Sequence, residues 1–187
     1  DNNNLIKVFK PLRKLKGQTG NILDKNFIID SIAQDKNNLD FIITNSESES
    51  YKNSLEEFYF NQGSFTYNNY QGININEDNL DFCNNILKKL NDYTKNFVLD
   101  TIIEVNGKTI IQYREKLTNY YIYDNYLNFY IENGKLKKIE FNYDNIGSFE
   151  GSKRDISYVQ EVILTFLHNI ENKNSTINIE RIDIVYA

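Results

Sequence analysis

Residues 97–143 read FVLDTIIEVNGKTIIQYREKLTNYYIYDNYLNFYIENGKLKKIEFNY, and this stretch decides the fold. Two Asn-Gly pairs, Asn106-Gly107 and Asn133-Gly134, each lie between runs in which apolar and polar residues alternate. Asn-Gly between such runs is typical of a two-residue type I′ hairpin, because both central residues of that turn need positive φ. The stretch therefore predicts four antiparallel strands in a meander.

The alternation also predicts which residues share a face of each strand, because successive side chains of a strand point to opposite sides. We expect one face to carry Phe97, Leu99, Ile103 and Val105 on the first strand, Thr109, Ile111 and Tyr113 on the second, Tyr121, Tyr123, Leu127, Phe129 and Ile131 on the third, and Ile139, Phe141 and Tyr143 on the fourth.

Two amphipathic helices are expected on either side of the meander. The earlier spans residues 78–92 with the apolar stripe Leu80, Cys83, Leu87 and Leu90, and the later spans residues 156–170 and begins with a Ser157/Gln160 capping box. We expect Leu87, Leu90, Ile163, Phe166 and Leu167 to be buried. A final strand over residues 176–186 changes the parity of its apolar residues at Glu180-Arg181, which predicts a β-bulge there.

The first 75 residues are less regular. They predict strands at residues 6–12, 39–44 and 55–60, a helix over residues 25–33, a polar loop over residues 46–50 and a turn-rich Tyr/Asn segment over residues 62–72. A break near residues 72–78 divides the chain into an N-terminal α+β lobe (1–75) and a C-terminal α-ββββ-α-β lobe (76–187). The predicted fold class is therefore α+β, with antiparallel sheets each covered by helices.

Composition excludes several classes of function. The chain has 187 residues, with 21 basic and 26 acidic ones, and its net charge of -5 offers no basic field for nucleic acid or an anionic membrane surface. A single cysteine, Cys83, and a single histidine, His168, cannot supply a Cys/His zinc set or an internal disulfide. We expect no cofactor, no metal and no nucleic-acid partner.

The residue bias indicates the source of the chain. It has 30 Asn, 25 Ile and 17 Lys but two Ala and four Arg, which is the pattern of an A+T-rich genome and suggests a low-GC bacterium. The sequence has no Met and does not start with one. No apolar run reaches the roughly 18 residues of a membrane span. We expect a removed N-terminal anchor or signal.

The residues that could carry chemistry have simpler structural explanations. His168 follows the apolar stripe of its helix without a partner or nucleophile nearby in sequence, and Cys83 lies within such a stripe. Residues 47–49 lack the loop of a calcium site, and residues 147–154 have three residues between the glycines where a phosphate loop has four. Those residues are interpreted as a flexible connector, and no feature selects a pair of catalytic carboxylates. The sequence predicts a non-enzymatic protein.

Aromatic residues are the excess with a possible functional meaning. Tyr120, Tyr126 and Tyr130 fall on the face opposite the Leu127/Phe129 stripe of the third meander strand. Tyrosine is favoured where one end of the side chain is apolar and the other wet, as at interfaces. The three tyrosines are the predicted partner-binding residues. A helix covering that face as well is an equally acceptable interpretation.

The C-terminal part of the chain resembles the YycI family. The resemblance is carried by residues 110–114, 121–131 and 133–135 of the meander, and by residues 153–157, 161–164 and 179–186 at the end of the chain. It spans residues 79–187. The family's Gly-Tyr-Tyr-like ending is replaced here by Val185-Tyr186-Ala187, which leaves room for a relative such as a YycH, PepSY-like or cystatin-like exported domain.

The resemblance implies a single-pass protein of the cell membrane of low-GC Gram-positive bacteria, with this domain on the extracytoplasmic side. It implies a regulatory domain that acts with YycH on the YycG sensor kinase, which with YycF forms the two-component system controlling cell-wall metabolism. The alternative expectation is a small exported ligand-binding or hydrolytic α+β domain, with its site between sheet and helix.

Overall fold

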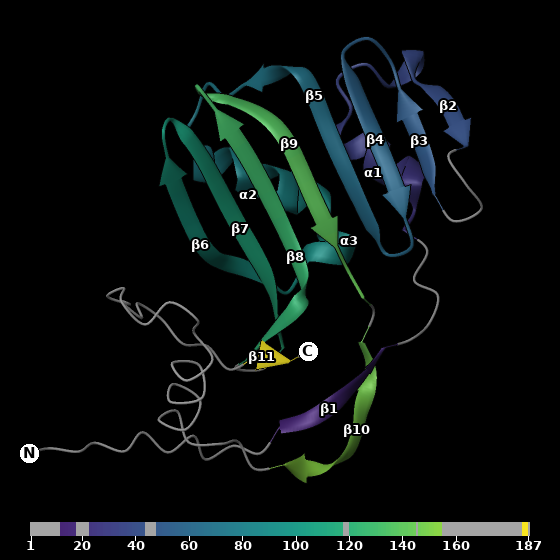
Figure 1. Cartoon of the computed structure of the whole chain (residues 1–187), viewed down its shortest axis with the longest axis vertical. Helices are drawn as coiled ribbons and strands as arrows, with labels where there is room; N and C mark the ends of the chain where they lie inside the picture. Colours follow the sequence, from purple (N-terminus) through teal and green to yellow (C-terminus); the bar gives the residue numbers. More distant parts are fainter. Residues whose placement is uncertain are drawn as a thin grey trace, which may run out of the picture.

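A computed structural model describes residues 12–17, 23–43, 48–117, 120–144, 146–154 and 185–186 (Figure 1). The helices are α1 (Lys25–Ile32), the short 3₁₀ helix η1 (Lys36–Asn38), α2 (Asn79–Lys89) and α3 (Asn91–Thr94). The strands are β1 (Leu12–Gly17), β2 (Asp40–Ile43), β3 (Glu49–Lys52), β4 (Glu56–Asn61), β5 (Ser64–Asn74), β6 (Phe97–Val105), β7 (Lys108–Leu117), β8 (Tyr120–Glu132), β9 (Lys135–Asn142), β10 (Ile146–Arg154) and β11 (Val185–Tyr186).

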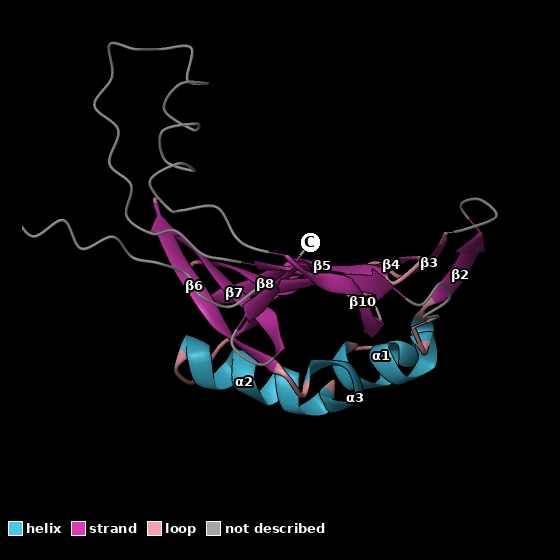
Figure 2. Ribbon diagram, turned by 90° about the horizontal axis from the view of Figure 1, so that it is seen from below, coloured by secondary structure: helices cyan, strands magenta, loops and turns pink. Residues whose placement is uncertain are grey.

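One large antiparallel sheet contains most of these strands, in the order β2-β3-β4-β5-β9-β8-β7-β6. β11 adds to it by parallel pairing with the start of β8, and β1 pairs with β10 in a separate two-stranded sheet. Helices α1, α2 and α3 all lie on one side of the large sheet (Figure 2). We call that side the helix face and the other the open face.

The prediction of an α+β fold, with separate antiparallel sheets each covered by helices, is wrong. The described residues form mostly one large antiparallel sheet with few helices. The cause is the pairing of β5 with β9, from Ser64 opposite Asn142 to Asn74 opposite Lys135, which joins the strands of the two expected lobes. The boundary at residue 75 falls between β5 and α2, and the division into two domains stays a prediction.

The strand order has an internal symmetry that the sequence did not reveal. After α1 the chain forms β2, β3, β4 and β5, and after α3 it forms β6, β7, β8 and β9. Each series begins at an edge of the sheet and ends at its centre. The two units meet at their fourth strands, β5 and β9, which pair antiparallel. Two helix-then-four-strand units therefore share one sheet and cover the same face of it with their helices (Figure 2).

Both predicted hairpins are confirmed. Asn106 and Gly107 have φ of 51° and 76°, and Asn133 and Gly134 have φ of 50° and 70°, the left-handed values of a type I′ turn. The first turn joins β6 to β7 and the second joins β8 to β9.

The predicted face of β6 is wrong because the strand carries a bulge. Leu99 lies opposite Tyr113, whereas Thr101 lies opposite Gln112, so Asp100 is the extra residue. Phe97 and Leu99 therefore lie on the helix face, while Ile103 and Val105 lie on the open face. The period-2 argument failed because one inserted residue reverses the parity of all that follow.

The face predicted for β8 is right for its second half and wrong for its first. Leu127, Phe129 and Ile131 are buried, but Tyr123 is 56% exposed. The register breaks between Arg114 and Lys116 of β7, where β8 contributes extra residues. The buried amide of Asn125 fills this break: its Nδ2 donates to Glu115 Oε2 at 2.6 Å, and its Oδ1 accepts from the backbone N–H of Asp144 at 2.8 Å.

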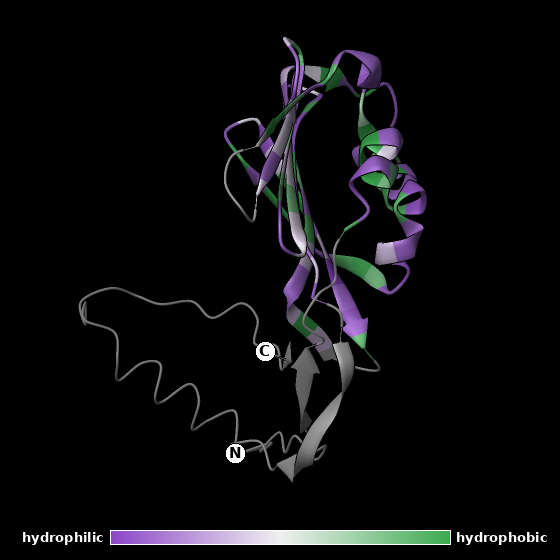
Figure 3. Cartoon of the chain, turned by 90° about the vertical axis from the view of Figure 1, so that its right-hand side faces the viewer, coloured by the Kyte–Doolittle hydropathy of each residue, from purple (hydrophilic) through white to green (hydrophobic). Residues whose placement is uncertain are grey.

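The helices form because the chain supplies caps and apolar stripes. The Asp24 side chain accepts from the backbone N–H of Phe27 at 3.0 Å, and the Asp78 side chain accepts from that of Leu80 at 2.8 Å. Helices α1 and α2 therefore each begin with a side-chain cap. Leu90 is buried as expected, whereas Leu87 is half-buried. The helices and the strands facing them appear edge-on in Figure 3, and the core between them includes Ile28, Cys83, Ile86, Phe58, Tyr67, Phe129, Ile139 and Phe141.

Three strands were not predicted, and a fourth, β1 (Leu12–Gly17), shares only its first residue with the strand expected over residues 6–12. Residues 49–50, expected in a polar loop, belong to β3, and the segment expected to be turn-rich forms most of β5. β5 alternates as a strand should, with Phe65, Tyr67 and Asn69 buried, but a buried Asn hides that pattern in the sequence. Residues 147–154, interpreted as a flexible connector, lie in β10.

Several expectations fall outside the described residues. They are residues 6–11 of the strand expected over residues 6–12, the helix over residues 156–170 with Ile163, Phe166, Leu167 and His168, and the bulge at Glu180-Arg181. Of the final strand, the structure describes β11, in which Val185 lies opposite Tyr121 and Tyr186 opposite Ile122.

Candidate functional site

The open face is the candidate site, and polar and aromatic side chains cover its centre. No described helix lies on this face (Figure 2). It is identified by register: residues opposite each other on neighbouring strands share a face, and the buried Ile111, Tyr113, Leu127 and Phe129 define the other side. The centre of the open face consists of Gln112, Arg114, Tyr126, Asn128, Tyr130, Lys138 and Glu140.

A tyrosine, a carboxylate and an ammonium group form one cluster at this centre. Tyr130 of β8 lies opposite Lys138 of β9, whose Nζ is 5.2 Å from the centroid of the tyrosine ring. The Tyr130 hydroxyl donates to Glu140 Oε2, and Glu140 also pairs with the Lys138 ammonium. The ring of Tyr130 is thus fixed from above by a cation–π contact and at its end by a hydrogen bond.

These contacts shift the pKa of the two acidic side chains in the cluster, Tyr130 and Glu140. Burial and the hydrogen bond to Glu140 raise the pKa of Tyr130 to about 12. Burial by itself would raise the pKa of Glu140, but hydrogen bonds from Lys138 and Tyr130 outweigh it, so the net pKa of that carboxyl lies below its usual range. At neutral pH the cluster holds a neutral phenol, a carboxylate and an ammonium.

Arg114 connects the open face across three strands. Its Nε is 3.1 Å from Asp100 Oδ2 in β6, its Nη2 donates to Gln112 Oε1 at 3.0 Å, and its Nη1 donates to the backbone carbonyl of Tyr123 in β8. The guanidinium carbon lies 4.9 Å from the centroid of the Tyr123 ring. Gln112 in turn donates to Asn128 Oδ1 at 2.8 Å. A polar network therefore holds the side chains of this face in place.

The structure places two of the three predicted partner-binding residues. Tyr126 and Tyr130 are half-buried on the open face, opposite Arg114 and Ile110 of β7. Tyr120 begins β8 opposite Leu117, and its side chain lies outside the described residues. The covering helix that was the other interpretation of these residues is not among the described helices.

Sequence reasoning missed other tyrosines of the same face. Tyr59 and Tyr70 lie on β4 and β5, and Tyr70 donates to Glu57 at 3.0 Å with Lys52 Nζ 5.5 Å from its ring centroid. The signal that could have found them is the strand parity of β5, since Tyr70 has the parity opposite to the buried Phe65 and Tyr67. Tyr123 was missed because of the bulge in β8.

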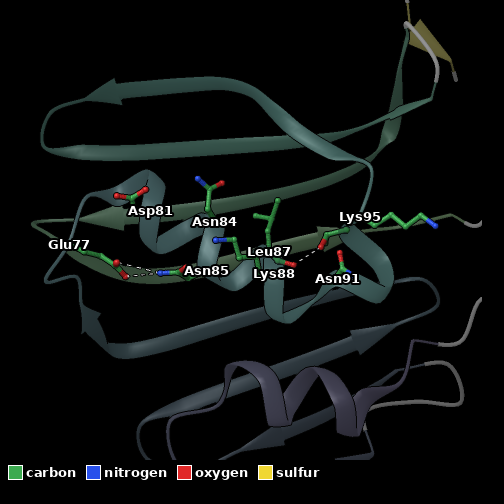
Figure 4. Close-up of a pocket in the computed structure, with 9 residues that line it drawn as sticks. Glu77, Asp81, Asn84, Asn85, Leu87, Lys88, Asn91 and Lys95 are labelled. Carbon is green, nitrogen blue, oxygen red and sulfur yellow. Dashed lines mark hydrogen bonds between the residues drawn. The ribbon is translucent and has the colours of Figure 1, made fainter.

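A second feature is a hollow of about 440 Å³ on the flank of α2 and α3 (Figure 4). Its lining is polar and of mixed charge, with Glu77 and Asp81 against Lys88 and Lys95. Glu77 accepts from the Asn85 amide at 3.3 Å, an interaction drawn in Figure 4. Carboxylates and ammonium groups on an exposed helix flank are the ordinary pattern of a solvated surface.

A buried carboxylate, Glu56, has a structural role. It accepts from the backbone N–H groups of Gln34 and Asp35 at 3.0 and 2.8 Å, and from the Tyr67 hydroxyl at 2.7 Å. It therefore attaches the residues that follow α1 to the sheet. Burial raises the pKa of Tyr67, whose hydroxyl also accepts from the Asn69 amide at 3.1 Å.

The remaining candidates are accounted for. Cys83 is fully buried, and burial raises the pKa of its thiol to about 12, so it is a core residue as the sequence predicted. Within the described ranges, no group of three or more His, Cys, Asp or Glu side chains is placed to hold a metal ion. None of the described helices is long and apolar enough to cross a membrane.

Comparison of the chain with family models, with curated proteins and with solved structures finds no match.

Proposed function

We propose that this chain is a non-enzymatic binding module that recognises a partner protein through the centre of its open face. The observation that carries the proposal is the set of tyrosine and arginine side chains on a sheet face without a described helix. Tyrosine and arginine are the residue types enriched in the energetically important centres of protein interfaces.

The fixed geometry of the face supports this function. Tyr130 is held by Lys138 and Glu140, and Arg114 is held by Asp100 and Gln112. Side chains that are already ordered lose little conformational entropy when a partner binds, so more of the contact energy appears as affinity. Their positions on strands rather than loops keep the face rigid.

The identity of the partners is a further part of the proposal. On the resemblance of residues 79–187 to the YycI family, we propose an extracytoplasmic regulatory domain, anchored to the cell membrane by a helix outside this chain. Its partners are then a YycH-like protein and a YycG-like sensor kinase, whose control of cell-wall metabolism it modulates. This part rests on the resemblance, whereas the binding face rests on the geometry.

The test is co-purification of the chain with the extracytoplasmic domains of a YycH-like protein and of a YycG-like kinase from the same organism. We expect retention of a partner by the natural chain and at least a tenfold loss of affinity in the double variant Tyr126→Ala/Tyr130→Ala. Tyr70→Ala is the matched control, because Tyr70 lies on the same face but on β5, and it should bind normally.

Circular dichroism of each variant establishes that the fold is kept. Equal loss of binding in Tyr70→Ala would contradict the placement of the interface at β7, β8 and β9. Failure of both domains to bind the natural chain, alone and as full-length membrane proteins, would overturn the assignment of the partners.

A further inference from the structure

Exposed aliphatic residues are concentrated on one edge strand of the sheet. Of the nine large hydrophobic residues that are exposed in the described part of the chain, five lie on β6. β6 ends the strand order, and β7 is its one neighbour among the described strands, so a row of backbone N–H and C=O groups faces away from them. The five residues, with exposed fractions from 39 to 58%, are Val98, Leu99, Ile102, Ile103 and Val105.

These residues point to both faces of the sheet. Leu99 and Ile102 lie opposite Tyr113 and Ile111 on the helix face, whereas Ile103 lies opposite Ile110 on the open face. A helix or a flat surface that covers one face would leave the other set exposed. A strand added alongside β6 would flank both sets and would pair with the outward backbone groups.

The strand at the other edge of the sheet, β2, is short, and a short edge strand offers few backbone groups for pairing with another chain. It has four residues, of which Phe41 and Ile42 are exposed. β6 has nine residues and no Lys, Arg or Pro, the residues that commonly protect an edge from pairing. Its bulge at Asp100 lies in the first half, which leaves the run from Thr101 to Val105 in regular register with β7.

The charges of β6 indicate what the added strand carries. Asp100 is paired with Arg114, but exposed Glu104 has no salt-bridge partner among the described residues. A second copy of the chain would bring the same acidic edge and a further net charge of -5. An aliphatic strand with a basic residue opposite Glu104 satisfies both the apolar and the charged groups.

We propose that β6 is a docking strand for an extended aliphatic segment of another protein, which carries a lysine or arginine opposite Glu104. The segment adds to the sheet as a further strand. This inference concerns the sheet edge and does not depend on the tyrosine face or on the identity of the partners proposed above.

The probe is a synthetic peptide as long as β6, in which valine alternates with threonine and a lysine stands at the second position, opposite Glu104 when the peptide pairs antiparallel along β6. We expect the full chain to bind it and the backbone amides of β6 to gain protection from hydrogen exchange. Ile103→Lys should weaken binding at least tenfold. Ile42→Lys is the matched control, because Ile42 is exposed to the same extent (49% against 47%) on the other edge, and it should bind normally.

A charge exchange tests the predicted contact with Glu104. Glu104→Lys should weaken binding of the lysine peptide by about fivefold and strengthen binding of the same peptide with glutamate in place of that lysine. Weakening of both peptides alike would overturn the charge assignment.

Two results would overturn the docking proposal itself. One is that the peptide does not bind and the β6 amides are already protected in the free chain, which would mean that the edge is occupied within the chain. The other is concentration-dependent dimerisation that Ile103→Lys abolishes, which would assign the edge to a second copy. Neither of these results depends on whether the Tyr126→Ala/Tyr130→Ala variant loses partner binding. The proposal for the β6 edge and the proposal for the tyrosine face can therefore fail independently.

Discussion

Arg114 and Asp100 form an ion pair across β7 and β6, with Nε 3.1 Å from Oδ2, and the aspartate is the extra residue of the β6 bulge. Both side chains are nearly buried, with exposed fractions of 13% and 11%. The bulge and the polar network of the open face are therefore held by the same contact.

Asp100→Asn should lower the free energy of unfolding by about 1–3 kcal/mol, because it leaves a mostly buried guanidinium without its counter-charge. Urea unfolding measures the change. Glu132→Gln is the control, since the Glu132–Lys108 pair is largely exposed and its loss should cost less than about 1 kcal/mol. Equal costs for the two variants would show that the Asp100 pair is no better shielded than a surface pair.

Glu56→Gln should also destabilise the chain, by about 1–3 kcal/mol, because an amide cannot accept with both ends from the donors that surround the carboxylate. Glu57→Gln, the next residue on the opposite face, should cost less than about 1 kcal/mol. Thermal or urea unfolding of the pair compares a buried carboxylate with a half-buried one on the same strand. A larger effect at Glu57 would contradict the structural role of Glu56.

Gly63→Ala should cost more than Gly134→Ala, although the two glycines have similar φ of 68° and 70°. Alanine at either position adds the strain of left-handed backbone, about 1 kcal/mol. At Gly63 the added Cβ would also meet the backbone carbonyl oxygen of Tyr143 at 2.8 Å, whereas nothing lies within 4 Å of it at Gly134. The difference between their free energies of unfolding measures the clash, and no difference would show that the Tyr143 backbone moves away freely.

Alkaline pH should destabilise the chain partly through Tyr130. The pKa of this tyrosine is raised from 10.0 to about 12 in the folded protein, so its contribution to stability is complete below pH 10 and is lost as pH rises to 12. Burial raises the pKa of Tyr67 and Tyr113 as well, so they share this loss. Tyr130→Phe should therefore make the free energy of unfolding fall less steeply over this range, as measured by urea unfolding at successive pH values. An unchanged slope would contradict the Tyr130–Glu140 contact.

The elements that could be predicted from the sequence are those with local signals. The Asn-Gly turns, the helix that begins near Asp78 and the burial of Cys83 and Leu90 depend on residues close together in the chain, and the structure confirms them. The pairing of β5 with β9 joins residues about 70 positions apart, and no local pattern encodes it. β5 also buries Asn69, which a rule based on apolar residues interprets as a loop.

The residues of the candidate site could likewise be predicted only where they lie on a regular part of a strand. Parity placed Tyr126 and Tyr130 opposite the buried stripe, because β8 is regular there. The alternation of apolar and polar residues could not place Tyr123 or the Arg114–Asp100 pair, because each depends on a bulge. The inserted residue of a bulge cannot be recognised from that alternation.

The junction of β5 with β9 also bears on how the chain is made. During synthesis β5 is complete at Asn74, but its partner strand begins only at Lys135, after α2, α3 and three further strands. A nascent chain on the ribosome must therefore carry an early unit whose β5 edge lacks its neighbour until α2, α3 and strands β6 to β8 have been translated. Short-range hairpins form in microseconds, whereas long-range pairing waits for loop closure. The interval before β9 emerges is the stage at which a chaperone would have the most to protect.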